Sequence, residues 1–338
     1  MNAHQAYRNF TWQLASQHFA TTEGNTCLSP LGPYLLLSMI ADSSTGETRK
    51  ELQELLADDE MNGTQTLGRV VSTCDAVASK TAIYFPEKLS TSGICALNLS
   101  TGFSDMSSTP EKGTDRLTFQ NRIGFRAGWQ TKFLETRKTF YSTTTENTLV
   151  KKVIPFIEQG RTFSQKETSE YVSVAIPFEK GCHMTLAMPK QKSLTACLRD
   201  PKFLEDALTL SPMGEVQLTL ALPKIQLKNF RLNLNSVLQE LGVKRIFECE
   251  NAQVNIVTEK NCYVEKLIQD AEISVDAKGA CALGLPTTPV VSSNSTAIDS
   301  CSKAICFDHP FVFAIWQTEP AEIPLFIGTI QNTEDLLC

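Results

Sequence analysis

The side chains that most often carry catalysis are scattered through this sequence. Its four histidines lie far apart along the chain, at His4, His18, His183 and His309. No G-x-S-x-G, H-E-x-x-H, Walker-type or Gly-rich dinucleotide motif accompanies them. Nucleophilic, metal-assisted and phosphate chemistry each need particular side chains at a fixed spacing. The sequence therefore predicts a protein that is not an enzyme and that binds no cofactor.

Eleven cysteines are the other reactive side chains. Cys301 and Cys306 are separated by four residues, and His309 follows them, which approaches the spacing of zinc ligands. No fourth ligand is evident nearby, so we interpret the two cysteines as free thiols and predict no metal site. An odd number of scattered cysteines in a chain of this length does not indicate a disulfide framework. We expect most of them to be buried free thiols.

Composition argues against several classes of partner. The net charge of −6 and the pI near 5.4 disfavour nucleic acid, which requires clustered Lys and Arg. The longest strongly apolar run, Leu35 to Ala41, is too short to span a bilayer, and the first residues do not resemble a secretory signal. Four N-x-[ST] sequons would matter only in the secretory pathway; they begin at Asn9, Asn62, Asn98 and Asn294. We expect a cytoplasmic monomer that binds neither nucleic acid nor membrane, with secretion left open.

Hydrophobic periodicity divides the chain into an early helical part and a later part rich in strands. Helices are expected at residues 4–20, after Ser29-Pro30, behind the capping-box pattern Thr48-x-x-Glu51, and from Leu232 to Leu241 before Gly242. Strands are expected at Ala82–Phe85, Leu117–Phe125, Phe140–Ile157, Tyr171–Phe178, Met184–Met188, Val216–Leu222, Glu272–Val275 and near the C-terminus. Ser, Thr and Gly dominate residues 90–114 and disfavour long helices there. This order predicts an α+β fold, with helices packed on antiparallel sheets.

Four blocks of sequence, taken in order, resemble the signature of the serpin family. They are similar to N-x-x-x-S-P with G-x-T-x-x-[QE]-L, then N-x-x-x-F-K-G-x-W-x-x-x-F, then L-x-x-L-G-[MIV], and finally H-P-F-x-F with L-F-x-G. The blocks are Asn25–Pro30 with Gly46–Leu52, Asn121–Phe133, Leu238–Phe247, and His309–Phe313 with Leu325–Gly328. Each block alone is weak, but their joint order over nearly the whole length is specific. Their large apolar and turn residues, such as Trp129 and Gly242, are most simply structural.

The resemblance implies a serpin fold in a single domain, residues 1–338, with large antiparallel sheets and an exposed reactive-centre loop at about residues 277–306. The chain is shorter than a typical serpin between Leu52 and Phe125, so we expect a reduced helical region around residues 88–116. In the family a protease of the serine or cysteine class cleaves the loop. The freed loop then inserts into the main sheet as a new strand and carries the attached protease with it.

The first part of the loop matches this mechanism. Gly279 corresponds to the family glycine that begins the hinge, and Ala280, Ala282 and Gly284 are small residues at suitable positions after it. If they face inward, they fit a packed sheet. This part of the sequence predicts that insertion starts.

Other positions depart from the family. Pro286 and Pro289 lack the backbone N–H that a central strand needs. Ala277 stands where the family usually has a hinge glutamate, and Gln269-Asp270 where it often has His-Lys. The function that the resemblance implies is a protease inhibitor that presents this loop as bait. These departures favour an insertion that starts and then stalls, so a non-inhibitory serpin-fold binding protein is the alternative function.

The bond that a protease would cleave can be counted in two ways. Family spacing forward from Gly279 gives Ser293-Asn294, and spacing backward from Phe307 gives Asp299-Ser300. We favour Asp299-Ser300, because Asp299 suits aspartate-specific proteases, although it is equally well one solvated charge on a long loop. With this choice the chain resembles poxvirus serpins that are directed at caspases and granzyme B. That likeness predicts a block of host apoptosis or inflammation if the protein is viral.

Overall fold

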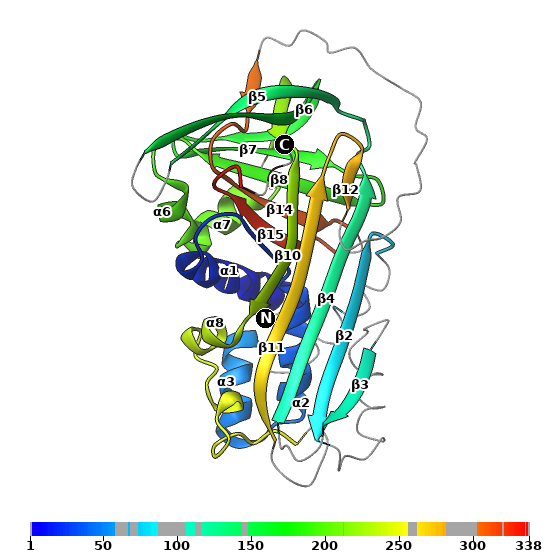
Figure 1. The fold of residues 1–338 in the computed structure, drawn as a ribbon, viewed down its shortest axis with the longest axis vertical. Coiled ribbons are helices and arrows are strands. Elements are labelled where there is room, and N and C mark those ends of the chain that lie inside the picture. The colour runs from blue at the N-terminus through cyan, green and yellow to red at the C-terminus, as the bar shows by residue number, and fades with distance from the viewer. Residues whose placement is uncertain are drawn as a thin grey trace.

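The part of the chain that the structure describes contains two β-sheets and a small group of helices (Figure 1). The computed structural model describes residues 2–57, 67, 74–86, 106–111, 116–143, 148–211, 213–255, 262–281, 303–319, 321–334 and 336. The helices are α1 (Ala3–Thr21), α2 (Leu31–Asp42), α3 (Gly46–Leu56), α6 (Leu194–Leu198), α7 (Pro201–Leu208), α8 (Asn235–Glu240) and the 3-10 helix η1 (Arg245–Phe247). The strands are β1 (Thr26–Leu28), β2 (Val77–Pro86), β3 (Met106–Glu111), β4 (Arg116–Gly128), β5 (Leu134–Thr143), β6 (Leu149–Glu167), β7 (Tyr171–Pro177), β8 (Cys182–Pro189), β9 (Gly214–Pro223), β10 (Ile225–Asn233), β11 (Tyr263–Val275), β12 (Gly279–Cys281), β13 (Ala304–Cys306), β14 (Phe311–Gln317) and β15 (Ile323–Ile330).

The six-stranded sheet has the order β10-β11-β12-β4-β2-β3. Its long strands β4 and β11 run side by side in the same direction along the length of the molecule (Figure 1). They pair directly as parallel neighbours from Arg116 and Tyr263 to Ile123 and Ala271. Beyond that point the short strand β12 lies between them and pairs antiparallel with both.

The nine-stranded sheet has the order β1-β15-β14-β8-β7-β6-β9-β13, with β5 paired to β6. Its strand β6 is 19 residues long and pairs with β5, β7 and β9. Strands β14 and β15 are buried along their whole lengths. Residues of these two strands therefore belong to the hydrophobic core.

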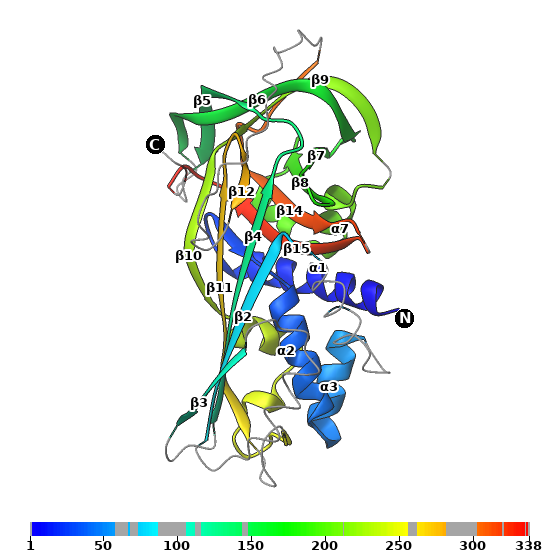
Figure 2. The same ribbon diagram turned by 90° about the vertical axis from the view of Figure 1, so that its right-hand side faces the viewer.

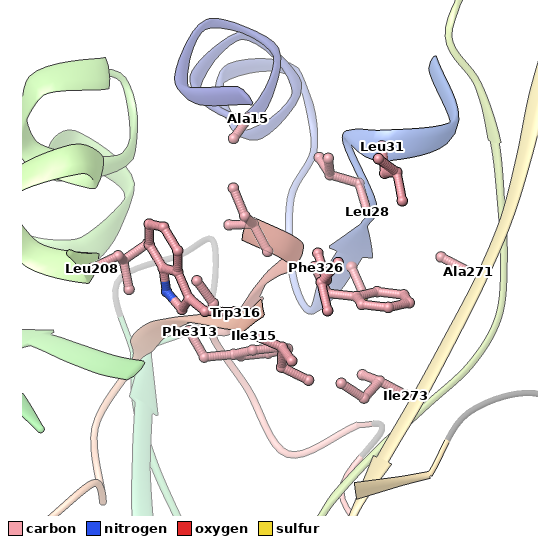
Figure 3. Close-up of a cluster of buried hydrophobic side chains, with 14 of the residues drawn as sticks. Ala15, Leu28, Leu31, Leu208, Ala271, Ile273, Phe313, Ile315, Trp316 and Phe326 are labelled. Atoms are coloured by element: carbon pink, nitrogen blue, oxygen red, sulfur yellow. The ribbon is translucent and has the colours of Figure 1, made fainter. Parts of the chain in front are cut away.

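The hydrophobic core lies between the two sheets and the helices. Helices α1, α2 and α3 all lie on one side of the six-stranded sheet (Figure 2). Figure 3 shows Ala271 and Ile273 of β11 facing the same buried space as Phe326 of β15. Strand β4 alternates buried and less buried residues over its first half, as a strand with one covered face should. This alternation directs Phe119 and Asn121 toward the helices.

The predicted α+β fold is confirmed, and helices α1 and α2 lie where they were expected. The predicted start of the third helix was wrong. Helix α3 begins at Gly46 with Thr45 at its N-cap position, so Thr48 lies inside it. The Thr48 hydroxyl instead accepts a hydrogen bond from the backbone N–H of Gln253, 3.2 Å away. A partner distant in sequence therefore uses the side chain that the local pattern assigned to capping.

Two further boundaries differ from the prediction. The strand expected at 140–157 belongs to two strands, β5 and β6, which form an antiparallel pair. Helix α8 covers only Asn235–Glu240, because residues 225–233 form β10. Gly242 follows α8 with a φ of +99°, as expected for a glycine that ends a helix.

The Ser/Thr/Gly-rich stretch contributes strand β3, which pairs parallel with β2. Only residues 112–115 separate the end of β3 from the start of β4, too few for a helix across the sheet. In the described part of the chain, no helix covers the face of the six-stranded sheet opposite α2 and α3 (Figure 2). Nor is any described helix both long and apolar enough to cross a membrane.

Candidate functional site

A tight turn at the end of β11 starts the segment of interest. The carboxylate oxygen Oδ1 of Asp276 accepts hydrogen bonds from the backbone N–H groups of Lys278 and Gly279, at 2.7 and 3.2 Å. The Asp276 N–H donates to the Gly279 carbonyl, 2.9 Å away. Aspartate favours such turns because its short side chain can bond to the backbone two residues ahead. The chain therefore reverses direction and enters the sheet as β12.

Strand β12 fits between β11 and β4 because its first residues are small. Ala280 is 2% exposed and pairs with Val275 on one side and Ala127 on the other. A Cβ atom at Gly279 would lie 2.2 Å from the Ala127 carbonyl oxygen and 2.7 Å from the Gly128 Cα atom. The backbones approach so closely that only glycine fits at this position.

Trp129, at the end of β4, holds the turn in place. Its indole Nε1–H donates to the Asp276 carbonyl at 2.8 Å, and its backbone N–H donates to the Lys278 carbonyl at 3.0 Å. The indole stacks on the ring of Phe178, with ring centroids 4.1 Å apart and planes 7° apart. Trp129 is therefore both a core residue and a donor to the turn that precedes β12.

We call the boundary between β4 and β11 the seam. Its open end is the part where β12 separates the strands, and its closed end is the part from residues 116–123 and 263–271 where they pair directly. In the loop mechanism described above, an inserting strand would have to enter the closed end. The groups that hold it shut are therefore part of the candidate site.

Buried amides lie behind the closed end. Gln269 is 0% exposed; its Oε1 accepts from the Ser29 N–H at 2.9 Å, and its Nε2 donates to the Ser29 carbonyl at 2.6 Å. Asn121 lies opposite Gln269 in the ladder and donates from Nδ2 to the hydroxyls of Ser79 and Thr81, at 3.2 and 3.0 Å. These bonds tie both strands of the seam to their surroundings.

Charged and polar side chains bridge the closed end on its other face. Asp270 accepts a hydrogen bond at 2.6 Å from Nε2 of Gln120 on β4 and lies 3.6 Å from the Arg122 guanidinium. Closer to the far end, Arg116 and Glu265 form a 2.8 Å ion pair across the same boundary. These contacts must break before another strand can enter.

After the loop, the first described strand is β13, which lies on the edge of the nine-stranded sheet. Strand β13 pairs parallel with β9. Just before it, the Lys303 ammonium contacts Gln165 Oε1 at 2.9 Å and Glu167 Oε2 at 2.7 Å. Hydrogen bonds from Lys190, Lys303 and Gln165 lower the pKa of Glu167 to about 2. The two ends of the loop are thus attached to different sheets.

The structure places part of the predicted site. Gly279 and Ala280 lie in β12, and Ala277 lies in the turn before it, where its carbonyl accepts from the Phe133 N–H. Outside the described residues lie Ala282, Gly284, Pro286, Pro289 and the candidate cleavage positions Ser293, Asn294, Asp299 and Ser300. Sequence reasoning missed Asp276, although the Asp-x-x-Gly pattern is a turn signal, and it assigned Trp129 to the core alone.

The sequence also predicted that the chain has no metal site and that most of its cysteines are buried free thiols. Within the described ranges, no group of three or more His, Cys, Asp or Glu side chains is placed to hold a metal ion. Cys301 lies outside those ranges. Seven described cysteines are free thiols, and five of them are buried.

The sequence model of the family described as serpin (serine protease inhibitor) matches residues 105–333, which include both strands of the seam. The chain belongs to the serpin family. The family comprises protease inhibitors rather than enzymes. The match also covers Trp129, the Asp276 turn and the start of the loop.

Curated relatives agree with this assignment. The serpin is 27% identical over 224 residues to an uncharacterized serpin-like protein of Thermococcus kodakarensis, covering 65% of this chain and 50% of that one. It is 28% identical over 234 residues to intracellular coagulation inhibitor 1 of Tachypleus tridentatus, covering 66% and 53%. Antichymotrypsin-2 of Bombyx mori is 27% identical over 204 residues, covering 57% and 52%. The chain thus matches about half the length of these curated relatives.

Solved structures establish the fold. Serpin48 of the insect Tenebrio molitor superposes with a TM-score of 0.80 at 17% identity, over 98% of both chains. Native protease nexin-1 with heparin superposes with a TM-score of 0.77 at 18% identity, over 98% of this chain and 100% of the other. The serpin fold expected from the sequence is confirmed.

Proposed function

We propose that residues 1–338 form a single, monomeric inhibitory domain that presents residues 277–306 to a protease as bait. After cleavage the segment from Gly279 onward continues into the seam as a full strand. One observation carries the proposal: β12 already lies between β11 and β4 and pairs with both. The loop therefore has its first residues in the position from which further insertion proceeds.

The energetics favour insertion once the loop is cut. Each step into the closed end exchanges one parallel ladder for two antiparallel ones. A segment of roughly fourteen residues, gaining on the order of 1 kcal/mol per new hydrogen bond, releases about 10 kcal/mol. The strands must separate by about 4.8 Å to admit it. Continued alternation from Ala280 would turn Ala282 and Gly284 inward, where small side chains fit.

For the target we propose a serine or cysteine protease that cleaves after aspartate, at Asp299-Ser300. Caspases and granzyme B have this specificity. If the protein acts in the cytoplasm of a host cell, it would then suppress apoptosis or inflammation, as a viral inhibitor would. Ser293-Asn294 is the alternative bond, and it would suit a protease with a different binding pocket.

Incubation of the purified protein with caspase-1, caspase-8 and granzyme B, with trypsin as a control, tests the proposal. Denaturing gel electrophoresis would reveal a covalent complex, and mass spectrometry would identify the cleaved bond. We expect a stable complex and a new N-terminus at Ser300. Quantitative cleavage at the loop with no complex would contradict inhibition, and cleavage after Ser293 would contradict the aspartate preference.

A serpin fold that serves as a binding protein is the second candidate. Pro286 and Pro289 favour it, because each removes a ladder donor from the strand that would insert. The bonds of Asp270 across the closed end favour it too. Thermal unfolding before and after loop cleavage separates the two functions. Insertion raises the melting temperature sharply, whereas a loop that cannot insert leaves it unchanged.

A further inference from the structure

Two cysteines that the proposed inhibitory mechanism does not use lie in contact between the two sheets. Cys74 lies three residues before the start of β2, and Cys182 is the first residue of β8. Their sulfur atoms are 3.9 Å apart, although 108 residues separate them along the chain. Both are buried, with 7% and 3% of their surface exposed. The contact therefore joins the six-stranded and the nine-stranded sheet beside the open end of the seam.

The surroundings hold both side chains in position. The Val77 N–H donates to the Cys74 carbonyl at 3.1 Å, and the Phe178 N–H donates to the Cys182 carbonyl at 2.9 Å. The neighbouring charged groups are Asp75 and Lys180, and the Lys180 ammonium reaches the Asp75 carbonyl at 3.4 Å. The contact between the two sulfurs thus lies within a fixed arrangement of backbone.

The environment shifts the pKa values of the two thiols in opposite directions. A hydrogen bond from the Cys182 thiol lowers the pKa of Cys74, and the backbone N–H groups of Ala76 and Val77 act in the same direction against the effect of burial. The same contact, together with burial, raises the pKa of Cys182. The Cys182 thiol also has the Lys180 carbonyl as a hydrogen-bond acceptor, 3.6 Å away, which favours the protonated form of Cys182. Because the thiolate is the reactive form, we assign the nucleophile to Cys74 and the resolving role to Cys182.

We propose that Cys74 and Cys182 form a redox-sensitive pair that a small peroxide oxidises to a disulfide between the two sheets. The Cys74 thiol loses its proton, and the thiolate attacks one peroxide oxygen. The O–O bond breaks, so that Cys74 becomes a sulfenic acid, and the hydroxide released from the peroxide takes up the proton to form water. Cys182 then gives up its proton, its sulfur attacks the Cys74 sulfur, and the S–O bond breaks with release of water. Two thiols are oxidised and one peroxide is reduced to two waters. The sulfurs must approach by about 2 Å to reach bonding distance.

The disulfide would strengthen an existing connection. The hairpin that ends at Cys182 already bonds to the end of β4, since the Glu179 N–H donates to the Gly128 carbonyl at 2.8 Å. A covalent bond would add β2 to this connection and fix the open end of the seam to the nine-stranded sheet. Because it closes a long loop of chain, it should also stabilise the folded state. The proposal is independent of the inhibitory function.

The unsubstituted, full-length protein tests the proposal directly. The reduced protein is treated with hydrogen peroxide, its remaining thiols are alkylated under denaturing conditions, and it is digested with trypsin without reduction. Cys74 is the sole cysteine of the peptide 70–80 and Cys182 that of the peptide 181–190. We expect these two peptides to be linked, the link to disappear with dithiothreitol, and the melting temperature of the oxidised protein to rise by about 5 °C.

Three results would overturn the proposal. They are Cys74 as sulfinic or sulfonic acid with Cys182 still a thiol, a link from either residue to a different cysteine, and two reduced thiols in a sample whose exposed Cys249 is oxidised. Variants add a matched control. Cys182→Ser should abolish the temperature shift and leave a sulfenic acid at Cys74 that dimedone traps. Cys197→Ser, which removes a buried cysteine on α6, should retain both the link and the shift.

Discussion

The open and closed ends of the seam both pair the backbones of β4 and β11, but they do so with different neighbours and different side chains. At both ends the backbone groups of β4 and β11 are paired, through β12 at one end and directly at the other. The side chains differ. The open end has Gly279 and Ala280, which let three backbones lie close together, whereas the closed end has buried Gln269 and bridging Asp270. Backbone pairing alone therefore does not decide how far the loop enters; the side chains along the seam decide it.

The largest effect is expected at the open end, from Trp129→Ala. The substitution removes a buried indole that stacks on Phe178, and it also removes the donor to the Asp276 carbonyl. We expect the free energy of unfolding, measured by urea denaturation, to fall by about 3–5 kcal/mol.

Trp129→Phe separates the two contributions. Phenylalanine keeps most of the ring contact with Phe178 but lacks the indole N–H. The lost hydrogen bond should therefore lower the free energy of unfolding by about 1 kcal/mol, in addition to the loss from the smaller ring. An equal loss in both variants would mean that the hydrogen bond to the turn, not the stack, holds the open end together.

Gly279→Ala tests the close approach of the backbones at the open end. The added methyl group would lie 2.2 Å from the Ala127 carbonyl oxygen, so β12 must shift or leave the sheet. We expect a loss of about 1–3 kcal/mol in unfolding free energy and faster hydrogen exchange at residues 279–281.

The matched control is Gly214→Ala, because a Cβ atom at Gly214 meets nothing within 4 Å. This variant should exchange at the unsubstituted rate in β12 and lose no stability. If Gly279→Ala behaved like this control, the fit of β12 would not depend on glycine.

At the closed end, Gln269→Leu removes the partner of two buried backbone groups of Ser29. Leaving the N–H and the carbonyl unsatisfied should cost about 2 kcal/mol in thermal or urea unfolding, in spite of the apolar replacement. Gln239→Leu, on the exposed face of α8, should be close to neutral. Equal effects of the two substitutions would show that the Ser29 contacts do not stabilise the seam.

Local patterns in the sequence predict much of this fold. Periodic apolar residues locate α1 and α2, and Gly242 predicts the end of α8, because these features depend on neighbours within a few residues. Ordered motifs over the whole chain indicate the family, and with it the glycine at the start of the loop. The start of α3 was missed because the Thr48 hydroxyl accepts a hydrogen bond from the backbone N–H of Gln253, a residue far along the chain.

Local sequence patterns do not predict which residues face each other across the seam. Asn121 and Gln269 become opposite neighbours only through the register of a parallel ladder between segments 148 residues apart. No periodicity within either strand fixes that register, since it depends on how both strands pack on the rest of the molecule. For the same reason the sequence shows Gln269 and Asp270 only as departures from a family pattern. Their partners, Ser29 and Gln120, give them a physical role.

Asp270→Ala should have the smallest effect on stability and a selective effect on the closed end. It removes the acceptor for Gln120 and the ionic contact with Arg122, while the backbone ladder between β4 and β11 stays intact. A surface contact of this kind contributes about 0.5–1 kcal/mol, so backbone amides of residues 116–123 and 263–271 should exchange roughly 2–5 times faster. Glu135→Gln removes a 2.6 Å ion pair with Lys224 away from the seam and should leave those amides unchanged. If both variants exchange alike, the bridges formed by Asp270 do not hold the closed end shut. The barrier to insertion would then lie in the ladder and in the buried amide of Gln269.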